Sequence, residues 1–228
     1  MFKFEFTYTG FALAIGLFFF LLVYTYIFRY MRNGKAIHTT SSATNNAITN
    51  AKNIITKNNQ KKGIIKYKNN YFLPSARKNK NILYLEKNNK NNSIYYNCLC
   101  VFEAFLYNQH QNNYFGWEMF YRINSFLIFL NSLWLFAFNM WIIAIVLLLY
   151  GLIVMIIFSV SNRKKIKNAQ LATIEYLKWQ YSNEEDIKIL ASAVDFHKIL
   201  YLDIFLISFF DTLNRIAKNF KQWGQYDE

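Results

Sequence analysis

One uncharged stretch constrains the fold of this chain more than any other feature. From Ile123 to Asn162 there is no charged side chain, and Phe, Leu, Ile, Val and Trp dominate the stretch. A hydrocarbon core about 30 Å thick needs about 20 apolar helical residues to cross it. Helices and closed barrels are the only structures that satisfy the backbone there. The sequence therefore predicts an integral membrane protein, with one very long crossing or two tight ones in this run.

A second uncharged run, Phe6 to Phe28, is also long enough to span a bilayer. It ends at Arg29 and Arg32, as a stop-transfer boundary does, and no small-residue cleavage pattern follows it. We interpret it as a retained anchor. The N-terminus lacks the amphipathic, Arg-rich and Ser-rich pattern of a transit peptide, which indicates synthesis inside the compartment where the protein works.

The long uncharged run could fold in two ways. A single helix would be about 60 Å long at 1.5 Å per residue. A hairpin would turn near Phe138-Asn139-Met140 and give a full second limb, Trp141 to Val160, although the turn has no Gly or Pro. The hairpin keeps both basic flanks on one side, as the positive-inside rule prefers. We therefore favour three crossings over two. The predicted fold class is all-α integral membrane, with two to three transmembrane helices, a long basic Asn/Lys-rich loop and a helical C-terminal tail.

This pattern divides the chain into five segments: an anchor (1–32), a polar low-complexity loop (33–97), an interfacial segment (98–122), a transmembrane helix or hairpin (123–162) and a helical tail (163–228). The loop is too polar to offset the entropy of ordering by itself. We expect it to be ordered against a larger neighbour, which would cover three apolar islands, Ile64-Ile65, Tyr71 to Pro74 and Ile82 to Leu85.

Local patterns predict helices in the last two thirds of the chain. Asn97 to Tyr107 would form a short interfacial helix with Leu99, Phe102 and Leu106 on one side. In the tail, Ser182 and Glu185 have capping-box spacing, which predicts a helix break near Ser182. Ile199 to Phe210 is apolar on most faces yet too short to span, so we expect another subunit to bury it.

The net charge of +13 is concentrated beside the predicted crossings. Basic residues outnumber acids between Arg29 and Arg122, and the cluster NRKKIK, Asn162 to Lys167, follows the long run directly. Anionic headgroups attract such flanks. We expect phospholipids among the partners, including an anionic lipid such as cardiolipin. Nucleic acid is not expected, because the Lys, Asn and Tyr enrichment follows from AT-rich codons.

No catalytic motif is present: the chain lacks G-x-S-x-G, Walker A, H-E-x-x-H, C-x-x-C and a dinucleotide fingerprint. Cys98 and Cys100 are interpreted as free thiols. The histidines lie outside the apolar runs, which argues against a haem held between membrane helices; they are His38, His110 and His197. Asp195, His197 and Asp203 are interpreted as a solvated helix face, and Glu118 with Arg122 as an interfacial ion pair. We predict no catalytic, cofactor-binding or metal residues, no cofactor and no enzymatic activity.

Three general features of the sequence resemble those of known proteins. They are the start MFKFEF directly before an anchor, Lys/Asn tracts such as KNNKNNS, and the high aromatic content of segments such as FLIFLNSLWLFAF. In these the chain resembles the divergent inner-membrane proteins encoded in ciliate mitochondrial genomes, the Ymf reading frames. Many of those are subunits of respiratory complexes or ATP synthase. The resemblance spans the whole chain without a family-specific motif, so it implies no functional residue.

The second crossing and its basic helical tail are also similar to the b subunit of ATP synthase, in which a membrane anchor continues into the peripheral stalk. The tail departs from that pattern, because it is shorter and more apolar near Phe205 to Phe210.

The leading hypothesis is a non-catalytic structural subunit of a mitochondrial oxidative-phosphorylation complex, either a respiratory-chain complex or the ATP synthase membrane sector. It would be a multi-pass protein of the inner membrane that holds other subunits and lipids together. One alternative is a small transporter or channel component using Asn131, Ser132 and Asn139. The other is a ribosome-associated membrane protein of mitochondria that reads RNA through its basic loop.

Overall fold

The computed structural model describes residues 5–58, 64–68, 77–79, 82–86, 92–109, 127–128 and 130–202. They are mostly helical, as predicted. The helices are α1 (Tyr8–His38), α2 (Ala47–Asn58), α3 (Ile94–Gln109), α5 (Trp141–Lys178) and α6 (Glu184–Leu202), and residues 130–137 are helical too. The strands are β1 (Ile64–Lys68), β2 (Arg77–Asn79) and β3 (Ile82–Glu86). Over the residues that the structure describes, no helix combines the length and the apolar character that a membrane crossing needs.

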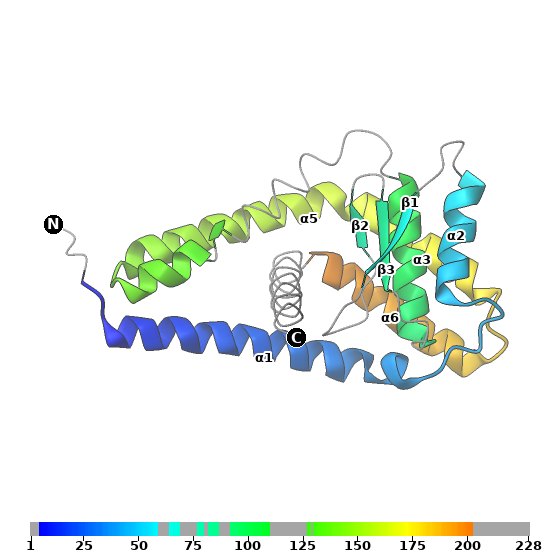
Figure 1. Cartoon of the computed structure of the whole chain (residues 1–228), viewed down its shortest axis with the longest axis horizontal. Helices are drawn as coiled ribbons and strands as arrows, with labels where there is room; N and C mark the ends of the chain where they lie inside the picture. Colours follow the sequence, from blue (N-terminus) through cyan, green and yellow to red (C-terminus); the bar gives the residue numbers. More distant parts are fainter. Residues whose placement is uncertain are drawn as a thin grey trace, which may run out of the picture.

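The molecule is elongated, with a narrow end and a wide end (Figure 1). At the narrow end the start of α1 meets the turn that leads into α5. The two helices diverge from there toward the wide end, where α2, α3, α6 and the strands gather. We call the narrow part, residues 5–28 and 130–160, the arm. The described residues at 33–109 and 161–202 form the head.

The chain turns at Phe138-Asn139-Met140, where the hairpin was predicted. Asn139 has a φ of 59°, and asparagine tolerates this left-handed region better than most other residues. The Asn139 N–H donates to the Phe136 carbonyl (3.2 Å), and the Met140 N–H donates to the Leu135 carbonyl (2.8 Å). Asn139 thus replaces the missing Gly or Pro. The single uninterrupted helix is wrong, because the helix breaks here before α5 begins at Trp141.

The start of α1 packs directly on this turn. The Thr7 N–H donates to the Ala137 carbonyl (3.1 Å), and the rings of Phe6 and Phe138 meet edge to face with centroids 6.1 Å apart. A Cβ at Gly10 would overlap the Phe136 backbone oxygen, whereas one at Gly16 would meet nothing within 4 Å. Gly10 therefore permits a close helix approach.

Helix α3 lies at the centre of the head and packs against α1, α2, α5, α6 and the sheet. The helix predicted over Asn97 to Tyr107 is present within α3, but it is not the interfacial helix that was expected. The helix starts earlier, at Ile94, and is buried on nearly all sides, while Leu99 on the predicted apolar side is only half-buried. An apolar helix of this kind needs neighbours all round, and the chain supplies them itself. The rest of the predicted segment, 110–122, lies outside the described residues.

The prediction that 33–97 is a loop ordered only against a larger neighbour is also wrong for the described part of this range, which has helices and strands of its own. Helix α1 runs past the expected boundary at Arg32 to His38, and α2 follows. Helix α2 buries its apolar side chains, which recur at helical spacing, against α3: Ala47, Ile48, Ala51, Ile54 and Ile55. The abundant Asn, Lys and Thr residues conceal this periodicity, because they occupy the other faces of the helix.

Two of the three apolar islands form strands of a small sheet, with strand order β1-β3-β2. Strand β1 pairs parallel with β3, placing Ile64 opposite Ile82, and β2 pairs antiparallel with β3. Leu83 and Leu85 are fully buried in the core of the head. The chain therefore covers these islands itself, and the fold is not purely α-helical. The island Tyr71 to Pro74 lies outside the described residues.

The predicted helix break near Ser182 is confirmed. Helix α5 ends at Lys178 and α6 begins at Glu184 with three acidic residues in its first turn, which suits the positive end of the helix dipole. The capping residue, however, is Asn183, whose Oδ1 accepts the Glu185 N–H (3.0 Å). The tail beyond residue 202, which includes most of Ile199 to Phe210, lies outside the described residues.

Replacing Gly10 by Ala should destabilise the arm, because the new methyl group forces α1 away from the Phe136 carbonyl. We expect a loss of about 1 to 3 kcal/mol in the free energy of unfolding, as in other overpacked contacts. Thermal unfolding of the purified chain in detergent, followed by circular dichroism, measures it. Gly16→Ala is the matched control and should be neutral or stabilising by up to about 1 kcal/mol. Equal effects of the two variants would contradict the close contact.

Candidate functional site

The arm exposes an extensive apolar surface. Val160 is 68% exposed and Phe20 is 65% exposed. The large exposed side chains of α1 include Phe11, Leu13, Ile15, Leu17, Phe19, Phe20, Val23 and Ile27; those of α5 include Ile142, Ile145, Val146, Leu149, Leu152, Ile153, Ile156, Ile157 and Val160. Soluble monomers rarely expose continuous apolar patches beyond a few hundred Å². The exposed apolar side chains therefore make the arm a candidate interaction surface.

The two apolar limbs of the arm have the same length, and they begin and end at corresponding positions along the arm. At 1.5 Å per residue, Tyr8 to Phe28 of α1 and Trp141 to Val160 of α5 are each about 30 Å long. Both limbs start at the docked end, where Thr7 bonds to Ala137. Both end in basic residues toward the head: Arg29 and Arg32 on α1, and Arg163 to Lys167 on α5.

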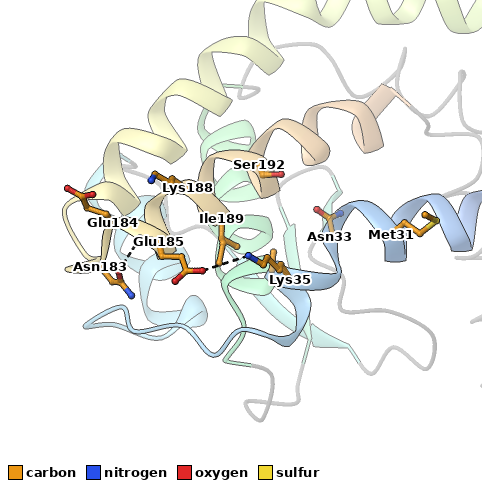
Figure 2. Close-up of a pocket in the computed structure, with 10 residues that line it drawn as sticks. Met31, Asn33, Lys35, Asn183, Glu184, Glu185, Lys188, Ile189 and Ser192 are labelled. Atoms are coloured by element: carbon orange, nitrogen blue, oxygen red, sulfur yellow. Dashed lines mark hydrogen bonds and ion pairs between the residues drawn. The ribbon is translucent and has the colours of Figure 1, made fainter.

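A cleft of about 780 Å³ opens just beyond the basic end of α1. It lies between the last turns of α1 and the first turns of α6, with Met31, Asn33 and Lys35 on one wall and Glu184, Glu185 and Lys188 on the other (Figure 2). The Lys35 ammonium lies 3.7 Å from the Glu185 carboxylate, and both side chains are largely exposed. Such a surface ion pair contributes little to stability, so it can rearrange around a ligand.

Asn33 is the unusual residue of this cleft. It is 1% exposed, yet among the residues that the structure describes neither its Oδ1 nor its Nδ2 has a hydrogen-bond partner. A buried polar group left unpaired costs about 1 to 3 kcal/mol, and such exceptions in native structures call for an explanation. Both amide atoms are inaccessible to solvent, so the groups that the cleft presents are its exposed charges, Lys35, Glu185 and Lys188.

A second polar cluster lies inside the head and is fully paired. Asn50 of α2 is completely buried and exchanges two hydrogen bonds with the amide of Gln180 (2.9 and 3.0 Å). It also donates to Asn97 Oδ1 of α3 (3.1 Å). Asn97 donates in turn to Ser41 Oγ and to the Tyr181 hydroxyl (both 3.3 Å). Because every amide has partners, this cluster fixes how α2, α3 and the α5–α6 turn dock.

Burial shifts the pKa values of two ionisable groups near this cluster, Tyr181 and Cys98. It raises the pKa of Tyr181 to about 12, so the hydroxyl stays protonated and keeps its place in the network. The Cys98 and Cys100 side chains are fully buried, and neither forms a disulfide bond with a described residue. Burial raises the pKa of the Cys98 thiol well above its ordinary value, which suppresses the reactive thiolate.

The structure does not bring the other candidate residues into one site. His38 lies exposed in the last turn of α1, and exposed Asp195 accepts a hydrogen bond from Gln170 of α5. Several others fall outside the described residues or have undescribed side chains: His110, Glu118, Arg122, His197 and Asp203. In the part of the chain that the structure describes, no group of three or more His, Cys, Asp or Glu side chains could hold a metal ion.

The three polar residues considered for a transport pathway do not share a surface in the arm. The Ser132 hydroxyl is buried and donates to the Ile128 carbonyl of its own helix (2.6 Å). Its neighbour Asn131 is exposed, and Asn139 lies in the turn. Sequence reasoning missed both Asn33 and Asn50. The helical spacing of the apolar residues in α2 could have placed Asn50 on a buried face, whereas no local signal distinguishes Asn33.

Comparison with known proteins finds no matching family, no similar curated protein and no similar solved structure.

Replacing Asn50 by Leu should destabilise the head, because it leaves buried Asn97 Oδ1 and the Gln180 amide without their partner. We expect a loss of about 1 to 3 kcal/mol for each buried group left unpaired, measured by denaturant unfolding of the purified chain. Asn53→Leu, at an exposed position of the same helix, is the control and should change stability by less than about 0.5 kcal/mol. Unchanged stability of the Asn50 variant would contradict a docking role for the network.

Proposed function

We propose that this chain is a non-catalytic structural subunit of a mitochondrial inner-membrane complex of oxidative phosphorylation. The arm lies in the bilayer as a multi-pass anchor, and the head lies against the membrane surface as a contact module. Neighbouring subunits and phospholipids, including anionic lipids such as cardiolipin, are its partners. The chain supplies contacts and performs no reaction of its own.

The observation that carries this proposal is the apolar surface of the arm, bounded by basic residues. Its two limbs are each about 30 Å long, which equals the thickness of a hydrocarbon core. The uncharged runs Phe6 to Phe28 and Ile123 to Asn162 support the same placement, although the described residues hold no helix that is long and apolar enough to cross a membrane. Lipid or an apolar partner would remove this surface from water.

The geometry of the arm supports three crossings. Because Thr7 is bonded to Ala137, the start of α1 and the turn at Phe138-Asn139-Met140 would lie on one side of the membrane. The head and both basic clusters would lie on the other side. This is the arrangement that the positive-inside rule favours, with the head on the side from which insertion proceeds.

The assignment to oxidative phosphorylation rests on the resemblance to the inner-membrane proteins of ciliate mitochondrial genomes. A respiratory-chain complex and the ATP synthase membrane sector are both compatible with it. The continuous α5, which runs from the arm into the head, is compatible with a stalk-like anchor. Helix α5 ends at Lys178, and the chain then reverses direction into α6. We therefore do not propose a long stalk that extends into water.

The subunit role predicts that the chain migrates with a large assembly. Membranes of the source organism would be solubilised mildly, separated by native electrophoresis and analysed by mass spectrometry along the lane. We expect the chain to follow one respiratory complex or ATP synthase. Migration alone at low mass would contradict the subunit role and favour a small transporter, whereas release by RNase and salt would favour the ribosome-associated alternative.

The topology predicts opposite exposure of the two ends of the arm. Glu5→Cys and Lys164→Cys variants would each be placed in sealed membrane vesicles and labelled with an impermeant maleimide. We expect the two positions to react from opposite faces, because one lies before the first crossing and the other in the basic cluster of α5. The buried native cysteines provide the unlabelled background. Labelling of both positions from the same face would contradict the arrangement.

A further inference from the structure

Helix α5 runs from the arm into the head (Figure 1), and an exposed stripe follows it across that boundary. Within the head, its buried side chains recur every three or four residues and so share one side of the helix. They are Asn162, Ile166, Ala169, Thr173 and Leu177. The opposite side is exposed at Ile153 and Val160 in the arm, and then at Lys164, Lys167 and Leu171. The apolar and basic parts of this stripe are therefore continuous.

Three cations gather just beyond the apolar part of the stripe. Arg163, Lys164 and Lys167 are exposed, and helical spacing puts Lys167 next to both of the others, with Cβ atoms about 5 to 6 Å apart. Among the described residues, none of the three forms an ion pair. The only acidic residue of α5 is Glu175, about two turns further on. These three positive charges are therefore available to an anionic ligand.

The cations lie at the level of the lipid headgroups if the arm spans the bilayer as proposed above. They follow Val160 by three to seven residues, which is about 5 to 10 Å along the helix axis. The headgroup layer is about 5 to 7 Å thick on each side of a bilayer, and long basic side chains can reach back toward it. The exposed side chains of Ile153, Ile156 and Ile157 would then lie beside the acyl chains of the same lipid.

The number of cations indicates the class of lipid. A headgroup with one phosphodiester carries one negative charge, which leaves most of the positive charge of Arg163, Lys164 and Lys167 unpaired. Two phosphates on one headgroup match three cations better, because each phosphate accepts charge-assisted hydrogen bonds from a separate cation. The backbone positions of Arg163 and Lys167 are about 6 Å apart along the axis, so the two phosphates need not share one point.

We propose that this face of α5 binds one anionic phospholipid that carries two phosphates, as cardiolipin does. Arg163 and Lys164 pair with one phosphate and Lys167 pairs with the other. The acyl chains lie along the apolar stripe from Ile153 to Val160. This inference names the place where the chain holds an anionic lipid, and it rests on the proposed function.

Lipid retention by the full chain tests the proposal. The protein would be reconstituted in phosphatidylcholine nanodiscs that contain either cardiolipin or twice the mole fraction of phosphatidylglycerol, so that the anionic phosphate charge is equal. Native mass spectrometry after release counts the lipids that stay bound. We expect one retained cardiolipin per chain, preferred over phosphatidylglycerol by about fivefold or more, because its second phosphate pairs with a further cation. Equal retention of the two lipids, or retention of neither, would overturn the proposal.

Single-charge variants separate this site from a general attraction of basic residues to anionic lipid. Lys164→Gln and Lys167→Gln, both at exposed positions, should each lower cardiolipin retention about fivefold. Lys178→Gln is the matched control on the same helix, about 16 Å beyond Lys167, and should retain the lipid. Lys165→Gln removes a charge at the same depth from another side of α5, so its effect should be smaller than that of Lys164→Gln. Equal losses in all four variants would contradict the site.

Two controls keep folding and membrane placement apart from lipid recognition. Because the substituted positions at Lys164 and Lys167 are exposed, these variants should keep the thermal midpoint of the parent chain in pure phosphatidylcholine. A chain that stays in nanodiscs with the expected topology, yet prefers no lipid, retains its anchor role and loses only this site. A chain that does not enter nanodiscs contradicts both the site and the proposed function.

Discussion

The structure depends on the burial of α3. This helix is apolar on almost every side, and Glu103 is its only Asp, Glu, Lys, Arg or His residue. It is stable in water only if other elements surround it. Helices α2, α5 and α6 together with the sheet do so. Because α5 is one continuous helix that also forms half of the arm, packing α3 sets the direction of the arm relative to the head.

The buried amides give this packing one specific arrangement. Apolar surfaces alone permit small rotations and shifts of helices, since hydrophobic attraction has no preferred direction. The reciprocal pair of Asn50 and Gln180, together with the contact from Asn50 to Asn97, is satisfied only when three elements meet at one point. Asn33 is the contrasting case. Its amide is equally buried, and among the described residues neither of its polar atoms has a hydrogen-bond partner.

The features that sequence reasoning found are local. The turn at Phe138-Asn139-Met140 and the break near Ser182 follow from short patterns of polar residues between apolar runs. The features that it missed are either hidden by a polar composition or depend on contacts between residues far apart in the sequence. The apolar periodicity of helix α2 is hard to recognise in the sequence because Asn, Lys and Thr dominate its composition. The parallel pairing of β1 with β3 joins Ile64 to Ile82 across eighteen positions, and no local pattern specifies such a partner.

The sequence by itself determined the two uncharged runs, their basic ends and the helical character of most of the chain. Charged side chains are costly in any apolar environment, whatever fold surrounds them, so their absence is informative alone. Only the tertiary structure decided that α3 is buried by its own chain and that Lys35 faces Glu185. Lys35 and Glu185 are 150 positions apart, and the elements that bury α3 are also distant in the sequence, so these contacts depend on how whole helices dock.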